Sequence, residues 1–440
     1  MKLDIQDVRS HFSAFAGENA PVYFDSAATA QTPDDVIDAM DEYYRTYCAN
    51  VHRGMHALTE QATLRYEDAR KTVGKWIGAK FTREIVFTKN CTEAINLVAR
   101  TWGDANLDEG DVIAVSLLEH HSNIVPWQQL AERKGAKIEW IEIDNDGQLK
   151  MDSLDEILSG GKVKHHNPKK DGSSKAHQKN NAEPGVAAAE QSGAERSRVK
   201  LVAVTGQSNV LGTRPDIKAI TQKAHDAGAL VLIDAAQLIG HHTVDVQDVD
   251  CDFLAFSGHK LYGPTGVGVL YAKRDLLEEM PPFLGGGMMI HEVKKDGFSP
   301  AESPQKFEAG TPPIAQAIGL AAAIDWLGQF SWEDIEKHEE DLLKAARKML
   351  ESIDDLTLFG PKDASGCISF VTDGAHPHDL TDILGQKHIA LRAGHHCTQP
   401  LHEKLGVPAT TRLSVGIYNT VEEIHTVKEG MQKALELLRS

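Results

Sequence analysis

The stretch CDFLAFSGHKLYGPTGVG at residues 251–268 decides the fold and carries the first candidate chemistry. Its first half reads as a buried strand, and a glycine-rich turn begins at Gly263. Lys260 lies between the two, where desolvation lowers the pKa of an amine and makes it a better nucleophile toward an aldehyde. Ser257 and His259 beside it could hold a phosphate. This combination predicts a Schiff-base lysine for pyridoxal phosphate; the alternative is an ordinary lysine at the end of a strand.

Strand-like and helix-like segments alternate around this stretch, from about residue 84 to residue 275. The alternation predicts an α/β fold with a mostly parallel seven-stranded sheet and helices on both faces. Ligands of such sheets bind at the carboxyl ends of the strands. The expected strands are 84–88, 111–116, 137–143, 200–204, 230–233, 253–257 and 266–272.

Three parts are expected along the chain. Residues 1–20 form a helical segment that packs with the small domain, residues 21–295 form the large cofactor-binding domain, and residues 296–440 form a smaller α+β domain. Residues 159–198 contain no aromatic side chain and no Leu, Ile or Met. Such a segment buries too little apolar surface to offset its ordering entropy, so we expect a flexible surface insertion.

Composition excludes several classes of partner. The formal net charge of −18 argues against nucleic acid and anionic membranes, which need a basic face. No apolar run is long enough to span a bilayer, and the first residues lack the order of a signal peptide, so we expect a cytoplasmic protein. The five cysteines show no CxxC spacing, and neither a disulfide framework nor a metal site is expected.

An acidic residue ends the apolar strand at 230–233. Asp234 would be costly to bury without a cationic partner, and a protonated pyridine nitrogen is such a partner. That pairing keeps the ring an electron sink. Gln237 could bond the phenolic oxygen of the ring. The alternative is an aspartate that caps a helix.

Three other strand ends carry candidate groups. His120 follows a strand and could stack on a flat cofactor. The alternative is that His120 and His121 are a pair of surface histidines at the start of a helix. Cys91 and Thr92 open a helix after another strand, where unpaired N–H groups and the helix dipole suit a phosphate. Asn209 stands at a further strand end.

The C-terminal third adds a thiol and a cation. Cys397 follows His395 and His396 in a loop flanked by Gly and Pro, and nearby positive charge would lower its pKa and favour the nucleophilic thiolate. A metal bound by these three is the weaker interpretation, because adjacent residues rarely coordinate one ion. Arg412 is a candidate clamp for a substrate carboxylate.

With these motifs in order, the chain resembles the SufS-type group II cysteine desulfurases, which are fold-type I, class V aminotransferase-like enzymes that use pyridoxal phosphate. The resemblance covers nearly the whole chain except 159–198. Its segments are DSAAT at 25–29, NVHRG at 50–54, EHHSNIVPW at 119–127, SNVLGT at 208–213, FSGHKLYGPTGVG at 256–268, FEAGTP at 307–312 and RAGHHCTQP at 392–400.

The resemblance implies a role for each candidate residue. It implies conversion of L-cysteine to L-alanine with a persulfide on Cys397, sulfur delivery for iron–sulfur cluster assembly, and a homodimer. Lys260 would bind the cofactor aldehyde and move protons. The other implied contacts are the ring face for His120, the ring nitrogen for Asp234, the ring oxygen for Gln237, the phosphate for Thr92, Ser257 and His259, and the substrate carboxylate for Asn209 and Arg412.

Two positions depart from the family pattern, and one motif points to a partner. Asn90 and Cys91 stand where the family usually has Gly and Thr, and Gly206 stands where a histidine is common, so the contact made by Cys91 is open. His378 resembles a histidine that, in enzymes served by a zinc-containing SufU-type scaffold, exchanges for a cysteine on the zinc of the partner. A surface histidine at a helix start is the alternative.

Other activities remain open at this point. Selenocysteine lyase and cysteine sulfinate desulfinase share the fold and the cofactor. A pyridoxal phosphate-binding scaffold subunit with little turnover is a different class, and the presence of both Lys260 and Cys397 argues against it.

Overall fold

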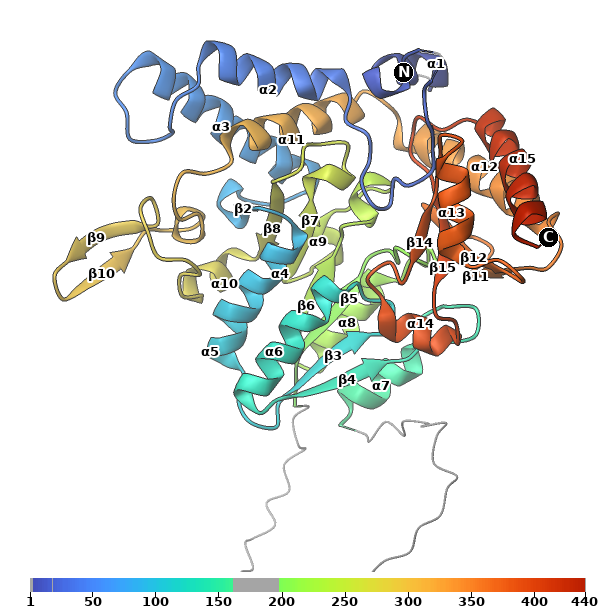
Figure 1. Ribbon diagram of the computed structural model, residues 1–440. Coiled ribbons are helices and arrows are strands. Elements are labelled where there is room, and N and C mark those ends of the chain that lie inside the picture. Colours follow the sequence, from blue (N-terminus) through green and yellow to red (C-terminus); the bar gives the residue numbers. More distant parts are fainter. Residues whose placement is uncertain (1–2, 18, 161–197, 440) are drawn as a thin grey trace, which may run out of the picture.

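The computed structural model describes residues 3–17, 19–160 and 198–439. Within them the chain forms a large seven-stranded sheet and a separate four-stranded sheet, which lies to the right of the larger one in Figure 1. Of the insertion expected at 159–198, residues 161–197 lie outside the described residues. No helix in the described part is long and apolar enough to cross a membrane.

The large sheet confirms the expected architecture. Its strand order is β2-β8-β7-β6-β5-β3-β4, with parallel pairing from β7 to β4 and with β8 antiparallel to both of its neighbours. Since β8 is antiparallel to both, β2 runs in the same direction as β7, and the carboxyl ends of six strands meet at one edge. The strands are β2 (Ile85–Thr88), β3 (Val112–Ser116), β4 (Lys137–Ile141), β5 (Val199–Thr205), β6 (Leu230–Asp234), β7 (Phe253–Ser257) and β8 (Gly268–Ala272).

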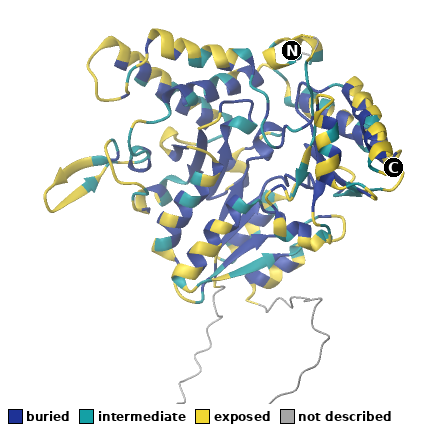
Figure 2. Ribbon diagram, in the orientation of Figure 1, coloured by how far each residue is buried: buried dark blue, intermediate teal, exposed yellow. Residues whose placement is uncertain are grey.

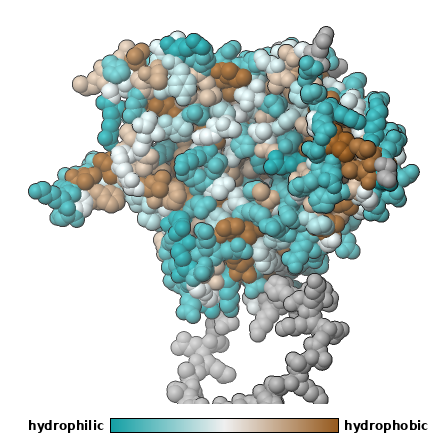
Figure 3. Space-filling model, viewed as in Figure 1, coloured by the Kyte–Doolittle hydropathy of each residue, from teal (hydrophilic) through white to brown (hydrophobic). Residues whose placement is uncertain are grey.

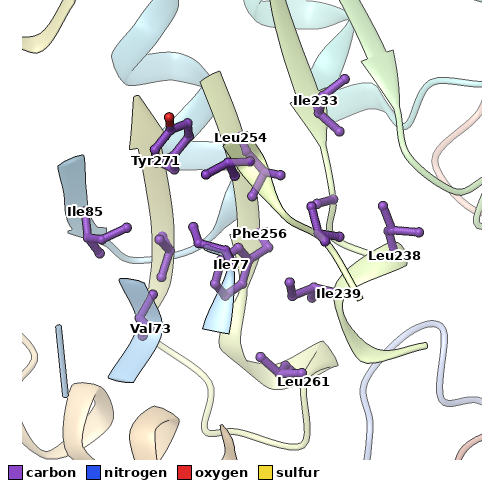
Figure 4. Close-up of a cluster of buried hydrophobic side chains, with 14 of the residues drawn as sticks. Val73, Ile77, Ile85, Ile233, Leu238, Ile239, Leu254, Phe256, Leu261 and Tyr271 are labelled. Carbon is purple, nitrogen blue, oxygen red and sulfur yellow. The ribbon is translucent and has the colours of Figure 1, made fainter. Parts of the chain in front are cut away.

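Helices bury both faces of this sheet, whose strands form the dark centre of Figure 2. Leu254 and Phe256 of β7 pack in one apolar cluster with Val73 (Figure 4), whereas Phe253 packs in a second cluster with Trp127. This split follows the alternation of side chains along a strand and explains why the strands read as continuous apolar runs. The main helices around the sheet are α2 (Asp34–Thr46), α3 (Ala57–Trp76), α4 (Cys91–Val98), α6 (Val125–Lys134), α7 (Met151–Leu158), α8 (Ile217–Asp226) and α11 (Ile314–Leu327), with the short α5 (Asp104–Asn106), α9 (Val246–Val249) and α10 (Arg274–Glu279) between them.

The four-stranded sheet is antiparallel, with the order β11-β12-β15-β14. Its apolar face packs against helices in a core of its own, in which Phe370 and Leu413 share one buried cluster with Leu342 and Val427. Its elements are β11 (Leu356–Phe359), β12 (Cys367–Thr372), β14 (Arg392–Gly394), β15 (Thr410–Ser414), α12 (Trp332–Glu351), α13 (Pro377–Gly385), α14 (Gln399–Leu405) and α15 (Val421–Leu438).

The N-terminal segment reaches the C-terminal unit. Arg9 of α1 (Ile5–Ser10) donates to the carbonyl of Tyr418 at 2.8 Å and to the carboxylate of Glu423 at 2.9 Å. Strand β1 (Val22–Tyr23) then pairs in parallel with β13 (Ile389–Ala390). The chain therefore contacts the C-terminal unit before it enters the large sheet.

Two features after residue 280 differ from the sequence expectation. An antiparallel hairpin, β9 (Ile290–Lys294) and β10 (Gly297–Pro300), was not among the expected strands; it projects from the body and exposes apolar side chains, Val293 and Phe298 among them (Figure 3). Helix α11 lies within the residues expected to form the C-terminal domain, but it packs against α2 and α3. Ten of its 14 residues are buried there among apolar side chains. The domain boundary at 295/296 stays a prediction.

A buried ion pair anchors the segment that returns from the hairpin. The carboxylate of Glu308 accepts from Arg70 at 2.6 and 2.9 Å, from the Phe87 N–H at 2.7 Å and from the Tyr66 hydroxyl at 3.1 Å. The side chains of Arg70 and Glu308 are only 1% and 6% exposed. Burial of this kind is tolerated only while both charges remain paired.

Glu308→Ala should therefore destabilise the protein by about 3–5 kcal/mol, because it removes the buried partner of the Arg70 guanidinium and leaves only the partly exposed carboxylate of Glu67. The exposed pair Arg274–Glu278 provides the matched control, and Glu278→Ala should change stability by less than about 1 kcal/mol. Urea denaturation of the three proteins measures both effects. Equal midpoints for Glu308→Ala and the unmodified protein would contradict this account.

Candidate active site

A cavity of about 570 Å³ opens at the carboxyl edge of the large sheet, where the four-stranded unit faces it. Both units contribute side chains to it. Except for His378, the sequence-predicted site residues all line this cavity: Cys91, Thr92, His120, Asn209, Asp234, Gln237, Ser257, His259, Lys260, Cys397 and Arg412.

Lys260 reaches the cavity from the end of β7. A single 3-10 turn, Gly258–Lys260, follows the strand and carries the amine into the space beneath the loops. Gly258 is required there because a Cβ on it would lie 2.8 Å from Val267 Cγ1. Burial lowers the pKa of the Lys260 amine; Asp234 opposes this effect, and Arg412 adds to it. The lysine is thus held in the poorly solvated position that favours a neutral, nucleophilic amine.

Asp234 ends β6 and is buried, with 4% of its surface exposed. Its Oδ1 atom accepts from the Ala236 N–H at 2.9 Å and from the Cys91 thiol at 3.4 Å. Burial raises the pKa of the carboxyl above its usual range. Gln237 lies one turn on and donates to the Ala27 carbonyl at 2.7 Å.

His120 is held as a neutral imidazole. Its Nδ1 atom accepts from the Ser122 N–H at 3.1 Å, which assigns the ring proton to Nε2. Burial, with a further contribution from Lys260, lowers the pKa of His120 to about 3. The ring therefore stays uncharged at neutral pH.

The turn after β2 forms a cradle for an anion. The Cys91 N–H at the start of α4 donates to the Ser257 hydroxyl at 2.9 Å, and Thr92 is exposed beside it. Gly268 lies directly under this turn, since a Cβ on it would meet the Asn90 backbone at 2.5 Å. His259 bonds Thr29 through Nδ1 at 3.2 Å, and burial lowers the pKa of His259 to about 4.

These residues fit pyridoxal phosphate group by group. The cavity offers an amine of lowered pKa for its aldehyde, a buried carboxyl for its ring nitrogen and the N-terminus of α4 with Ser257 for its phosphate. Among the described residues, no cluster of His, Cys, Asp and Glu has the arrangement of a metal site.

Arg412 comes from β15 and is 2% exposed. Its two terminal nitrogens donate to the Asn209 carbonyl at 2.9 Å and to the Asp25 carboxylate at 3.0 Å, while Nε has no partner among the described residues. The Arg412 side chain lines the cavity, and its guanidinium fits a planar carboxylate bound there.

The cysteine loop joins β14 to α14. His396 and Cys397 both have left-handed backbone angles, with φ of 48° and 60°, and the Cys397 side chain is exposed at the cavity. The Asn209 amide donates to the His396 carbonyl at 2.7 Å, so this predicted substrate residue also holds the loop. His378 lies outside the cavity at the start of α13, where its Nε2 is 3.7 Å from the position of a Cβ on Gly394.

Sequence reasoning gave no role to three residues that shape the site. Asp25 positions Arg412, Glu119 lies fully buried behind His120, and His121 contacts the cysteine loop. All three lie in segments that carry the family resemblance, DSAAT at 25–29 and EHHSNIVPW at 119–127. A charged residue next to a buried strand end was the available signal for Glu119.

Gly268→Ala should weaken cofactor binding at least about tenfold, a loss of about 1.4 kcal/mol, because the added methyl group displaces the Asn90–Thr92 turn. Reconstitution of the apoprotein with pyridoxal phosphate, followed by its visible absorbance, measures the affinity. Gly385→Ala is the control, since nothing lies within 4 Å of its Cβ position. Unchanged affinity in Gly268→Ala would show that this turn does not hold the phosphate.

Comparisons with known proteins agree with this geometry. The model of the family described as aminotransferase class-V matches residues 22–164 and 177–427. A cysteine desulfurase of Haloferax volcanii is 43% identical over 419 residues, covering 94% of this chain and 90% of the relative. A cysteine desulfurase of Enterobacter sp. is 42% identical over 442 residues and covers 100% of both chains.

Solved structures give the same result. The cysteine desulfurase CsdA of Escherichia coli, in its S-sulfonic acid form, superposes with a TM-score of 0.85 at 38% identity, and the apo cysteine desulfurase of Thermococcus onnurineus with 0.86 at 39%. Each match covers 99% of both chains. Sequence and fold together show that the chain belongs to the class-V aminotransferase family, among its cysteine desulfurases, which depend on pyridoxal phosphate.

Proposed function

We propose that this protein removes sulfur from L-cysteine, releases L-alanine and keeps the sulfur as a persulfide on Cys397. One observation carries the proposal: a single cavity contains the Lys260 amine, the buried Asp234 carboxyl, the Arg412 fork and the Cys397 thiol. An aminotransferase would need the first three but no thiol.

The substrate would be held by its carboxylate. Arg412 lines the cavity, and Asp25 and Asn209 fix the two terminal nitrogens of its guanidinium. A guanidinium fixed in this way recognises a planar carboxylate by geometry as well as by charge. The α carbon of the amino acid would then lie in the same space as Lys260.

Proton transfer at the α carbon is assigned to Lys260. When bound, pyridoxal phosphate supplies an electron sink for the electrons left by that proton. The lowered pKa of Lys260 favours the neutral amine, which can accept the proton and return it. His120, neutral and with its proton on Nε2, can donate a hydrogen bond without adding charge.

Sulfur transfer is assigned to Cys397. Its thiolate supplies the electron pair for the new sulfur–sulfur bond while the carbon–sulfur bond of the substrate breaks. The electrons of the broken bond remain on carbon, which takes up a proton and becomes the methyl group of alanine. One L-cysteine and one thiol thus give one L-alanine and one persulfide.

Cys397→Ala should keep the yellow colour of the bound cofactor and lose alanine release from L-cysteine, because the acceptor of sulfur is gone. Lys260→Ala should lose turnover altogether. Cys48→Ala is the matched control, since Cys48 is exposed and does not line the cavity. Alanine release at the normal rate by Cys397→Ala would refute the desulfurase mechanism.

The same proposal extends to the acceptor of the sulfur. His378 is exposed, and its ring lies beside Gly394, three residues before Cys397, which supports docking of a zinc-containing SufU-type scaffold at this face. A zinc ion accepts neutral imidazole readily, so such a histidine can replace a cysteine ligand of the partner.

We further propose that the protein is a cytoplasmic homodimer. The five cysteines are free thiols, which suits a reducing compartment. Gly285–Gly287 forms an exposed loop, which we expect to reach a second subunit.

His378→Ala should abolish the stimulation by such a partner, measured as the ratio of alanine release with and without the zinc-loaded scaffold. His425→Ala, at an exposed position of α15 in the same unit, should retain that ratio. Equal stimulation of both variants would remove His378 from the proposal.

A further inference from the structure

The second histidine of the Glu119–His121 turn faces the cysteine loop, and the mechanism above does not use it. We propose that His121 is the positioning residue that docks the sulfur-accepting loop onto the large sheet. This inference rests on the proposed function, because only that function makes Cys397 the sulfur acceptor. The contacts between His121 and the loop can be tested without any turnover.

His121 contacts the main chain of the loop at two points that follow the Cys397 side chain. Its backbone N–H donates to the Cys397 carbonyl at 2.8 Å, and its Nε2 accepts from the Gln399 N–H at 3.1 Å. A backbone N–H can only donate, so Nε2 carries no proton and the ring proton lies on Nδ1. The imidazole therefore binds the main chain of the loop and does not depend on the side chains there.

The turn that presents His121 is fixed from below. Glu119 has 0% of its surface exposed, and its carboxyl accepts from the Thr205 N–H at 2.7 Å, the Asn123 amide at 2.7 Å and the Ser116 hydroxyl. The Asn123 oxygen in turn accepts from Trp127 at 2.8 Å. These bonds join the ends of β3 and β5 to the start of α6, so the turn offers a rigid base for the loop.

The loop requires such a base because of its own backbone. His396 and Cys397 are consecutive residues with side chains at φ of 48° and 60°, a conformation that costs free energy and persists only where surrounding contacts impose it. Three contacts to the large unit hold this segment: the Asn209 amide on the His396 carbonyl, the His121 N–H on the Cys397 carbonyl and the His121 ring on the Gln399 N–H. Without the His121 imidazole, the backbone bond to the Cys397 carbonyl remains, but the Gln399 N–H loses its partner in the large unit.

The dock is sensitive to protonation. The titratable groups around the ring are His395 and Cys397 from the loop and His120 on the same turn, whose ring centroid is 6.2 Å away. Burial and then His395 lower the pKa of His121 below its usual 6.5. A proton on Nε2 would point at the Gln399 N–H, so two donors would face each other and the hydrogen bond would be lost. Docking is therefore fully favoured above pH 6.5 and weakens as the pH falls below that value.

The test measures the loop itself in the pyridoxal phosphate-loaded protein. Iodoacetamide alkylation of Cys397, mapped by peptide mass spectrometry, reports its accessibility, and the exposed Cys48 in the same sample is the internal reference. Hydrogen exchange of the peptide that contains Gln399 reports the bond. His121→Ala should raise the Cys397 to Cys48 alkylation ratio several-fold and speed exchange, with kcat for alanine release falling more than KM changes.

Two further variants separate docking from general damage. His121→Gln offers a side-chain oxygen to the Gln399 N–H, so it should stay near the unmodified protein and should not loosen below about pH 6.5. Gln399→Pro removes the donor at the first position of α14, where proline is compatible with a helix, and should loosen the loop without touching the turn.

Unchanged alkylation and exchange in both His121→Ala and Gln399→Pro would overturn the inference, and so would equal loosening of His121→Ala and His121→Gln. If the unmodified protein released no alanine while these variants loosened the loop as expected, the proposed function would fail and the docking role would stand.

Discussion

Desolvation at the carboxyl edge of the large sheet is the physical constraint on which the site depends. The strands end in a space closed off by the second unit, and charged groups there lose the stabilisation that water would give them. The same burial acts in opposite directions on different groups: it lowers the pKa of the Lys260 amine and of the His120 imidazole and raises the pKa of the Asp234 carboxyl. A cofactor with an aldehyde and a basic ring nitrogen suits both groups: the aldehyde can react with the neutral Lys260 amine, and the ring nitrogen can pair with the Asp234 carboxyl.

The cavity exists only because distant segments of the chain meet. Arg412 of the four-stranded sheet is held by Asp25 from the N-terminal region and by the Asn209 carbonyl from the large sheet. Asn209 also binds the His396 carbonyl next to Cys397. The groups that would hold the substrate carboxylate and those that place the thiol therefore share one polar network, so a shift of either unit would move both.

Sequence reasoning recovered the large sheet because its strands are buried on both faces and read as apolar runs, and it recovered the cavity lining because motifs at strand ends converge in such a fold. It did not identify β14, since residues 392–394 become a strand only by pairing with β15, and it did not indicate that α11 packs against α2 and α3, since a helix apolar on all sides does not reveal which core it enters. The network of Glu119 was invisible because its partners, Ser116, Asn123 and Thr205, come from three different elements.

The most direct test of the central claim is to follow the sulfur atom. The purified protein would be given L-cysteine labelled with heavy sulfur, digested without reductant and mapped by mass spectrometry, with alanine measured in the same sample. This account predicts one labelled sulfur on Cys397 for each alanine formed before any acceptor is added. Alanine formation with label on Cys91 or Cys48, or with no label on Cys397, would contradict it.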